Sequence, residues 1–464
     1  MDDTKLSDLQ PLDSRNSPDH VRAVDTEEGT IDNGSVAYKV YKRRWFGLAL
    51  LTLLNITASF DWLTFAPVSQ KAAVYYGVSE NSINWLSTGF LFAFVVAAPA
   101  TIYVLHLGPK PSIIAASGLM LVGNWVRFAG SYSADGGNFG AAMAGQILTG
   151  FAQPFVLSAP TRYSDMWFTE RGRITATALA SLANPFGGAI IQLIVPAIVD
   201  VPSSMSMGVL IVAIVATVFA IPSIFLPAKP PSPPGPSGNT PKLSLRQSFK
   251  ALNTLEIWLL LIPYSVFVGF FNSISSLLNQ ILMPYGFTSD EAGIAGALLI
   301  VVGLVASAIA SPIIDRKKTV LVTSKCLVPV IAVCYVVFIF MPGSGSLAGP
   351  YTILSVLGAS SFILVPVALE FLCEITHPLS PEVTSTIAWS GGQLLGGIFI
   401  VISDALKAGP EADPPLNLFW ALVFSAIIAS LMVPLVLCLG LFGRADRVAL
   451  RRTQSDQGHS ELHR

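Results

Sequence analysis

The sequence has little charge and few residues of the kinds that bind metals. Charged residues make up 12% of its 464 residues, against about a quarter in an average soluble protein. Apolar residues make up 52%, and the formal net charge of −1 provides no overall field to attract nucleic acid. So little charge cannot cover the surface of two or three soluble domains. We therefore predict that the chain resides in a lipid bilayer.

The cysteines and the first residues of the chain exclude further classes of protein. All four cysteines lie in apolar stretches, without paired spacing or a metal-ligand pattern. We expect reduced, buried thiols, and neither a metal nor another cofactor. Residues 1–38 are polar and acidic, and they lack the apolar core of a cleaved secretory signal. We expect this segment to be a disordered tail.

Apolar runs of bilayer length recur along the rest of the chain. A helix needs about 20 residues to cross a bilayer, and backbone groups in lipid must be satisfied within the segment, so we predict helices and not strands. A stretch rich in Pro, Ser and Gly separates six runs from six more, as a flexible linker would. The predicted helices are 45–68, 83–105, 112–131, 139–160, 174–199, 205–226, 257–282, 293–314, 320–341, 350–373, 383–406 and 416–442.

These runs predict an all-α membrane protein with 12 transmembrane helices in two six-helix bundles. Basic residues gather on one side of the predicted topology, and the other side receives little beyond Lys71, Arg127 and Lys407. By the positive-inside rule, both tails and the linker lie in the cytosol. The host membrane stays open between the plasma membrane and a vacuolar or lysosomal one. The predicted parts are an N-terminal tail at 1–38, a bundle at 39–227, a linker at 228–253, a bundle at 254–443 and a C-terminal tail at 444–464.

A weak internal repeat supports two related halves. A shift of 209 positions sets Trp62 against Phe271, and therefore the first helix against the seventh. The fifth helix matches the eleventh in the same way, although paired glycines are common in membrane helices and chance stays a possible explanation. Duplicated halves related by an axis along the membrane normal are how transporters of the major facilitator type form a midplane cavity. The matched residues of these two helices are Ser181, Asn184, Gly187 and Gly188 against Ser390, Gln393, Gly396 and Gly397.

An ionisable residue and a tryptophan are adjacent in the first helix. The Asp61 carboxylate can hold an organic cation or cycle a proton, and the Trp62 indole can bind a quaternary ammonium group by cation–π attraction. Alternatively, Asp61 makes a polar contact between helices and Trp62 packs. On the seventh helix, Phe271 and Asn272 hold the equivalent position, with Tyr264 two turns earlier. They are candidates for a facing aromatic wall, or for ordinary packing.

Uncharged amides at mid-membrane depth are a second candidate signal. Gln153, Asn184 and Gln393 lie on the fourth, fifth and eleventh predicted helices. An amide offers donors and acceptors without the cost of a charge, which suits a polar substrate but also joins helices. Glu370 and Glu374, one turn apart near the inner end of the tenth helix, are candidates to bind basic residues and gate the cavity.

Several strings resemble a known family of transporters. They include WLTFAPV at Trp62, INWLS, NPFG at Asn184, SSLLNQIL, VPVALEFLCEITHP and the GQ at Gln393. Over about residues 40 to 440 the chain resembles the feline leukaemia virus subgroup C receptor-related transporters, which form solute carrier family 49 of the major facilitator superfamily. It is most similar to the branch called major facilitator superfamily domain-containing protein 7.

The resemblance implies a function and a set of residues. It implies facilitated transport of choline, ethanolamine or a related cation, with haem and vitamin-like substrates also proposed for members. It further implies that Trp62, Gln153 and Gln393 line a central cavity. Two departures qualify this. An aromatic residue of the family aligns with Asn272, beside Phe271, and the gating motif is degenerate after the second helix. Asp315 and Arg316 keep more of that motif after the eighth helix.

Other function classes fit the residues less well. His106 and His377 are the only histidines near the predicted membrane, and both fall at helix ends, so no midplane imidazole is available to ligate haem iron. A receptor or sensor is a further alternative, but the tails carry no recognisable docking module. No catalytic cluster occurs at a shared depth, so we do not expect an enzyme. We expect a monomer whose partners are a small-molecule substrate and the lipid bilayer, with coupling to protons left open.

Overall fold

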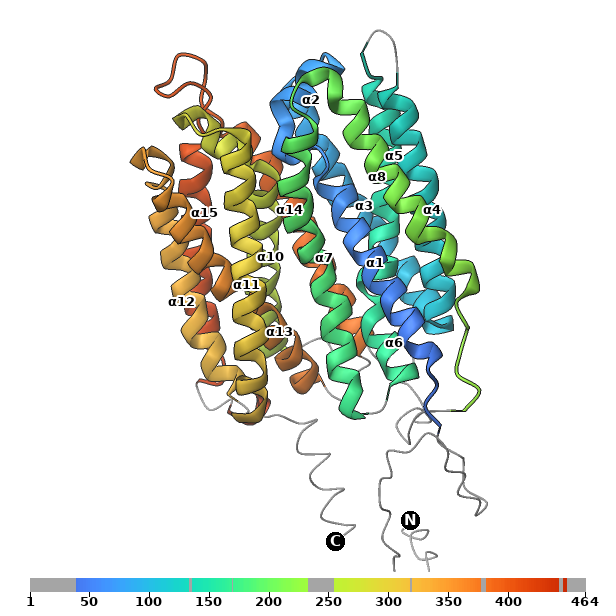
Figure 1. The fold of residues 1–464 in the computed structure, drawn as a ribbon. Helices are drawn as coiled ribbons and strands as arrows, with labels where there is room; N and C mark the ends of the chain where they lie inside the picture. Colours follow the sequence, from blue (N-terminus) through green and yellow to red (C-terminus); the bar gives the residue numbers. More distant parts are fainter. Residues whose placement is uncertain are drawn as a thin grey trace, which may run out of the picture.

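A computed structural model describes residues 39–132, 136–168, 170–232, 254–317, 319–376, 381–441 and 445–448. Residues 1–38 and most of the predicted linker and C-terminal tail lie outside these ranges. Within them the regular secondary structure is entirely helical. The long helices run roughly alongside one another and form an elongated bundle (Figure 1).

The helices form two sets that stand side by side (Figure 1). The first set is α1 (Arg43–Leu63), η1 (Ala66–Val68), α2 (Ser69–Tyr76), α3 (Glu80–Leu107), α4 (Pro109–Ser131), α5 (Phe139–Leu157), α6 (Ala159–Trp167), α7 (Glu170–Ile198), η2 (Pro202–Ser204), α8 (Met205–Ala220) and η3 (Ile221–Phe225). The second is α10 (Leu255–Leu282), η5 (Met283–Tyr285), α11 (Ser289–Lys317), α12 (Val320–Phe338), η6 (Pro342–Ser344), α13 (Ala348–Thr376), α14 (Pro381–Ala405), α15 (Phe419–Leu437) and η7 (Ala445–Val448).

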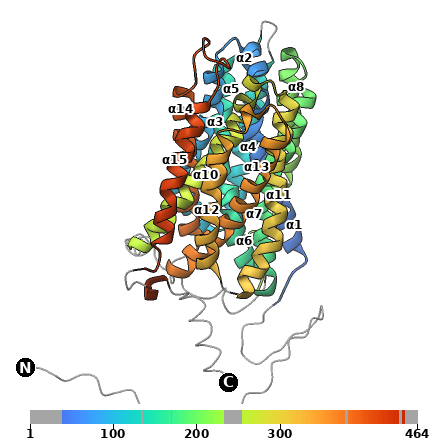
Figure 2. The same ribbon diagram turned by 90° about the vertical axis from the view of Figure 1, so that its left-hand side faces the viewer.

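Most of the long helices are suited to a bilayer. Eleven helices within the described ranges are long and apolar enough to cross a membrane. The remaining long helix is α5, in which two glutamines, Gln146 and Gln153, interrupt the apolar sequence. Together they make the twelve predicted runs. The bundle has a terminal end, where α1 begins and α15 ends, and a distal end, where α2 lies (Figures 1 and 2).

Two of the predicted helices are each divided into two α-helices, and several others, such as α8 and α15, end a few residues early. The first predicted helix extends to residue 68, but α1 ends at Leu63. Pro67 explains the break, because it has no N–H to donate to the carbonyl four residues earlier and its ring clashes with that turn. The chain then continues as η1 and α2. Similarly, the fourth predicted helix divides at Ser158 into α5 and α6.

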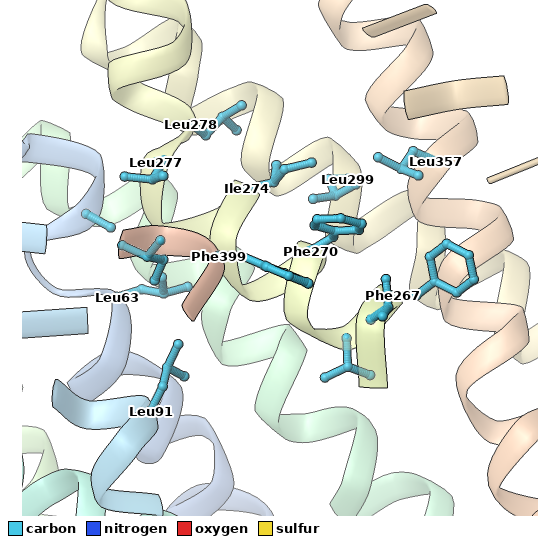
Figure 3. Close-up of a cluster of buried hydrophobic side chains, with 14 of the residues drawn as sticks. Leu63, Leu91, Phe267, Phe270, Ile274, Leu277, Leu278, Leu299, Leu357 and Phe399 are labelled. Atoms are coloured by element: carbon cyan, nitrogen blue, oxygen red, sulfur yellow. The ribbon is translucent and has the colours of Figure 1, made fainter. Parts of the chain in front are cut away.

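The two sets of helices meet through an apolar core. Figure 3 shows Leu63 of α1 and Leu91 of α3 together with Phe270 of α10 and Phe399 of α14. Within the first set, a Cβ atom on Gly187 would lie only 2.6 Å from the Ile56 carbonyl oxygen, so glycine allows α7 to approach α1 closely. Close helix packing therefore fixes the first helix, which carries the candidate residues.

Candidate functional site

Aromatic rings from the two halves meet in the middle of the bundle. The ring centroids of Trp62 on α1 and Phe271 on α10 are 6.4 Å apart, with planes tilted by 54°. Phe271 also makes an edge contact with Phe362 of α13, at 5.4 Å. Trp62 is only 4% exposed, and its indole N–H has no hydrogen-bond acceptor among the described residues. The internal repeat thus pairs two residues that face each other across the halves.

An amide pair lies next to these rings. Asn272 follows Phe271 on α10, and its Nδ2 donates to Gln393 Oε1 of α14 at 3.0 Å. The same nitrogen lies 3.4 Å from the Gly392 carbonyl oxygen. A Cβ atom on Gly396 would lie 2.8 Å from Asn272 Cβ, so α10 and α14 are in close contact at this level. Asn272, which departs from the family pattern, is therefore bonded to one of the two glutamines that the resemblance predicts to line a cavity.

The other polar candidates have separate surroundings. Gln153 of α5 is buried, and its Oε1 has no hydrogen-bond donor within the described ranges. Asn184 of α7 donates to the Asn55 carbonyl oxygen of α1 at 3.0 Å, which is a contact between helices. Tyr264 is buried, makes an edge contact with Trp389 at 6.1 Å, and has a hydroxyl for which the described residues offer no partner.

Asp61 lies in a polar cluster inside the N-terminal half. Its Oδ1 is 3.4 Å from Nη1 of Arg127 on α4, and both side chains are fully buried. The Asp61 carbonyl oxygen accepts hydrogen bonds from Arg127 Nη1 at 3.2 Å and from Gln146 Nε2 at 2.9 Å. The geometry corresponds to the polar interhelical contact that was the alternative for Asp61. Arg127, which was counted on the side opposite the chain termini, lies in the last turns of α4 toward the distal end, and its guanidinium is buried against the carboxylate.

A group of polar side chains, which we call the distal latch, joins the two halves at the distal end. Ser69 Oγ of α2 donates to Asn279 Oδ1 of α10 at 3.3 Å, and Asn279 Nδ2 donates to the Pro67 carbonyl oxygen at 3.0 Å. The latch therefore attaches directly to the segment after the break in α1. Its members are Ser69, Glu80 and Asn84 from the first half and Asn279, Gln280, Asp404 and Lys407 from the second.

The second part of the distal latch contains charges. Asn84 Nδ2 of α3 donates to Asp404 Oδ1 of α14 at 2.6 Å, and Gln280 Nε2 donates to Asn84 Oδ1 at 2.6 Å. Lys407 Nζ pairs with Glu80 Oε2 across the halves at 2.7 Å. No sequence pattern indicated this group, although Lys407 was assigned to the side opposite the chain termini, and SSLLNQIL, which contains Asn279 and Gln280, is among the strings that resemble the family.

The predicted gating residues lie at the terminal end. Glu374 is buried in the last turn of α13, and Arg316 is exposed in the last turn of α11. The side chains of Asp315 and Glu370 lie outside the described residues. His106 is exposed in the last turn of α3, also at the terminal end, and His377 falls outside the described residues.

Comparison with known proteins places this arrangement in a family. Residues 51–401 match the Major Facilitator Superfamily. Solute carrier family 49 member A3 of Danio rerio is 33% identical over 390 residues, which cover 81% of each chain. The chain belongs to solute carrier family 49. This confirms the resemblance and the twelve-helix fold of the superfamily, so the protein is a multi-pass membrane transporter and not an enzyme.

Other members of the family and solved structures are also similar to the chain. The choline/ethanolamine transporter FLVCR1 of Felis catus is 30% identical over 414 residues, covering 84% of this chain and 73% of that one. A D-xylose-proton symporter has a TM-score of 0.64 at 13% identity, covering 84% of this chain and 97% of that one. A bacterial homologue of the lysosomal transporter Spinster has a TM-score of 0.57 at 16% identity, covering 89% and 98%. These structures support the fold alone.

Proposed function

We propose that this member of family 49 transports choline, ethanolamine or a related small organic cation by alternating access. The observation that carries the proposal is the meeting of Trp62 and Phe271, one from each half, beside the Asn272 and Gln393 amides. A relative at 30% identity is named as a choline/ethanolamine transporter, which supports the same substrate class.

The chemistry of these groups suits such a cation. An aromatic face attracts an ammonium group by about 0.5 to 2 kcal/mol, with tryptophan the strongest. The buried Trp62 N–H and the buried Gln153 Oε1 have no partners among the described residues, and buried polar groups without partners are costly. A substrate with a charged group and a hydroxyl or amine can supply these missing hydrogen bonds. We assign the charged group to the rings and the polar group to Gln153 and Gln393.

The charges at the distal end support entry of a cation from that side. Acidic residues outnumber lysines in the described distal segments, and such an excess raises the local concentration of cations. We propose that the distal end faces the non-cytosolic phase, with both tails and the linker in the cytosol and the two bundles at 39–227 and 254–443. The acidic residues are Glu80, Asp200, Asp290, Glu291, Asp404, Glu411 and Asp413, and the lysines are Lys71 and Lys407.

The contacts at the two ends of the bundle are the proposed gates. The distal latch holds the two halves together at one end, so its hydrogen bonds must break for the site to open to the distal phase. At the other end we propose that Asp315, Arg316, Glu370 and Glu374 gate the terminal side. Alternating access then consists of rocking one half against the other around a fixed midplane site. We propose that a monomer suffices, because each chain contributes both halves.

Uptake by reconstituted vesicles tests the substrate. Vesicles containing the purified full chain should accumulate radiolabelled choline, whereas empty vesicles should not. Trp62→Ala should reduce the rate at least about tenfold, the equivalent of about 1.4 kcal/mol of lost binding. Trp420→Ala is the matched control, because Trp420 is 61% exposed on α15 and uptake should not change.

Two results would contradict the proposal. Uptake no faster than in empty vesicles rejects choline as the substrate, and binding of choline without uptake indicates a receptor. Haem is the less favoured substrate, since His106, the one histidine among the described residues, lies in the last turn of α3 at the terminal end.

A further inference from the structure

We propose that Asp61 is a proton-binding site whose occupancy controls the opening of the distal end. The proton site stands on the geometry of the N-terminal half, and only its link to transport depends on the proposed function. The Asp61 side chain points toward Arg127 of α4, within its own half, whereas Trp62 faces α10. The carboxylate is therefore free to serve a role other than substrate binding.

The ion pair of Asp61 and Arg127 is only partly satisfied. One contact of 3.4 Å joins the two side chains, although a carboxylate and a guanidinium can form two parallel hydrogen bonds. Asp61 Oδ2, Arg127 Nε and Nη2, and Gln146 Oε1 have no hydrogen-bond partners among the described residues. The desolvation cost of such a buried pair exceeds its attraction unless further hydrogen bonds satisfy both groups. Binding a proton removes the buried negative charge, and the buried Arg127 charge then depends on its neutral partners.

The surroundings of the pair also accept the protonated form. Arg127 would keep its hydrogen bond to the Asp61 carbonyl oxygen at 3.2 Å, and its guanidinium lies 5.2 Å from the centre of the Phe65 ring. Asn124 Oδ1 is a further acceptor at 3.5 Å. The new O–H of Asp61 requires an acceptor, and Gln146 Oε1 is a buried, unpartnered one on the side chain whose Nε2 donates to the Asp61 carbonyl oxygen. Arg127 then has no counter-ion, and its charge depends on these neutral groups.

Few other titratable groups compete for this proton. Arg127 of α4 and Tyr76 of α2 face the cluster, and the Tyr76 hydroxyl bonds to Ser131 Oγ at 2.5 Å. Neither α5 nor α8, which both pack against α1, contains a titratable residue. Among the other neighbouring helices, Glu80 begins α3 at the distal end, where it bonds to Ser69 and Lys407. The remaining titratable residues lie toward the terminal end: Tyr103 and His106 of α3, Lys110 of α4, Arg162, Tyr163 and Asp165 of α6, and Glu170, Arg171 and Arg173 of α7.

The position of Asp61 links the proton to the distal latch. Arg127 and Gln146 hold the Asp61 carbonyl oxygen where α1 ends, and that carbonyl lacks an ordinary helical partner because the helix stops at Leu63. Six residues later, Ser69 bonds to Asn279 of the second half. If Arg127 binds the end of α1 less tightly, the segment 64–69, which includes a member of the distal latch, becomes able to move.

The proposed step is the reversible addition of one proton to one carboxylate. A proton from the distal aqueous phase binds an Asp61 oxygen to form a neutral carboxyl group, and the weakened ion pair releases the segment after α1. After the halves reorient, the proton leaves to the terminal phase and the ion pair forms again. No other group gains or loses charge in the cycle.

Infrared difference spectra test the site without any substrate. Lowering the pH from about 8 to about 5, above the ordinary range of exposed carboxyl groups, should give a protonated-carboxyl band in the full chain in vesicles. The partly buried Asp404 of the distal latch can contribute to the same band, so the signal of Asp61 is the part that its substitution removes. Asp61→Asn should reduce the band, and Asp290→Asn, at an exposed carboxylate, should leave it unchanged. The paired change Asp61→Asn and Arg127→Gln avoids an unpaired buried charge and should reduce the band equally. A band as large in either Asp61 variant as in the unaltered protein overturns the proposal.

Transport tests the coupling separately. Choline uptake by the unaltered protein should change several-fold between the same two pH values, and Asp61→Asn should show a ratio near one. If uptake of the unaltered protein does not depend on pH, the coupling is rejected. If choline is not taken up but the infrared band behaves as expected, the substrate assignment fails and the proton site stands.

Discussion

The two halves of the molecule have different kinds of residue at one equivalent position, a charged one in the first half and an aromatic one in the second. The shift that pairs Trp62 with Phe271 also pairs Asp61 with Phe270. Asp61 lies against Arg127, whereas Phe270 stacks on Phe399 with centroids 4.4 Å apart and lies 5.1 Å from Tyr335. The C-terminal half shows that aromatic packing fills this position without any charge. The fold alone therefore does not require the ion pair of the N-terminal half.

The equivalent helices also differ just after this position. Pro67 in the first helix corresponds to Ser276 in α10 under the same shift. Serine can donate its backbone N–H, so α10 continues unbroken to Leu282, whereas α1 ends at Leu63. The charged pair and the helix break therefore occur together in one half only. This coincidence is what connects Asp61 to the movement of the distal segment.

Removing one charge tests the comparison most strongly. Asp61→Leu leaves the buried Arg127 unpaired and should lower the free energy of unfolding by about 3 to 5 kcal/mol. Phe270→Leu, at the equivalent position, should cost about 1.5 kcal/mol, because one apolar side chain replaces another. Reversible unfolding in mixed micelles measures both.

The paired variant Asp61→Leu and Arg127→Met is the control for this experiment. It should recover most of the lost stability, since well-packed apolar residues replace buried ion pairs without loss. If Asp61→Leu alone lowers the free energy of unfolding no more than Phe270→Leu does, the carboxylate does not compensate the charge of Arg127, and the description of the pair is wrong.

The difference between the facing rings should appear in transport. Trp62→Phe makes the two halves alike and should lower kcat/KM for choline about tenfold, because an indole binds a cation more strongly than a phenyl ring. Phe271→Leu should lower kcat/KM for choline about threefold, because a phenyl ring attracts a cation less strongly than an indole does. Initial rates of uptake across choline concentrations measure both values. Equal losses for the two variants would mean that the indole has no special role.

The fold could be predicted from the sequence, and the candidate site only in part. Twelve apolar runs and the linker carry the fold, because the length of a membrane helix is set by the bilayer itself. The shift that aligned Trp62 with Phe271 identified two residues that the structure brings together. The count of basic residues assigned Arg127 to one side of the membrane but did not show that its guanidinium is buried against Asp61. A local signal for burial was present, since Arg127 falls inside the predicted helix 112–131.

The distal latch could not be predicted in the same way. Lys407 and Glu80 are separated by 327 positions and belong to different halves, so no local pattern connects them. Asn84 and Gln280 are amides on apolar helices, and such residues join helices in many arrangements. Their partners depend on how the two halves meet, which is a property of the whole bundle. The end of α1 is different, because Pro67 is a local signal that a stricter interpretation would have used.

The residue after each facing ring offers a smaller test. Asn272 corresponds to Leu63, so Asn272→Leu makes the second half match the first. The variant removes the 3.0 Å hydrogen bond to Gln393 and should lower kcat/KM for choline about threefold, as expected for the loss of one neutral hydrogen bond. Asn417→Leu, in the distal loop, is a control outside the site. A change as large as that of Trp62→Phe would place Asn272 in direct contact with the substrate.

The smallest effect is expected at the ion pair of Lys407 and Glu80, which joins the two halves. Lys407 and Glu80 are partly exposed, at 10% and 18%, so their pair contributes less than about 1 kcal/mol to the closed distal end. Lys407→Met should therefore increase the labelling rate of a cysteine placed at Ser69 about twofold, and high salt should reduce the difference between the variants. Lys71→Met is the matched control, because Lys71 bonds to the Val199 carbonyl oxygen within its own half. If Lys71→Met increases labelling equally, loss of surface charge explains the effect, and the ion pair does not hold the halves together.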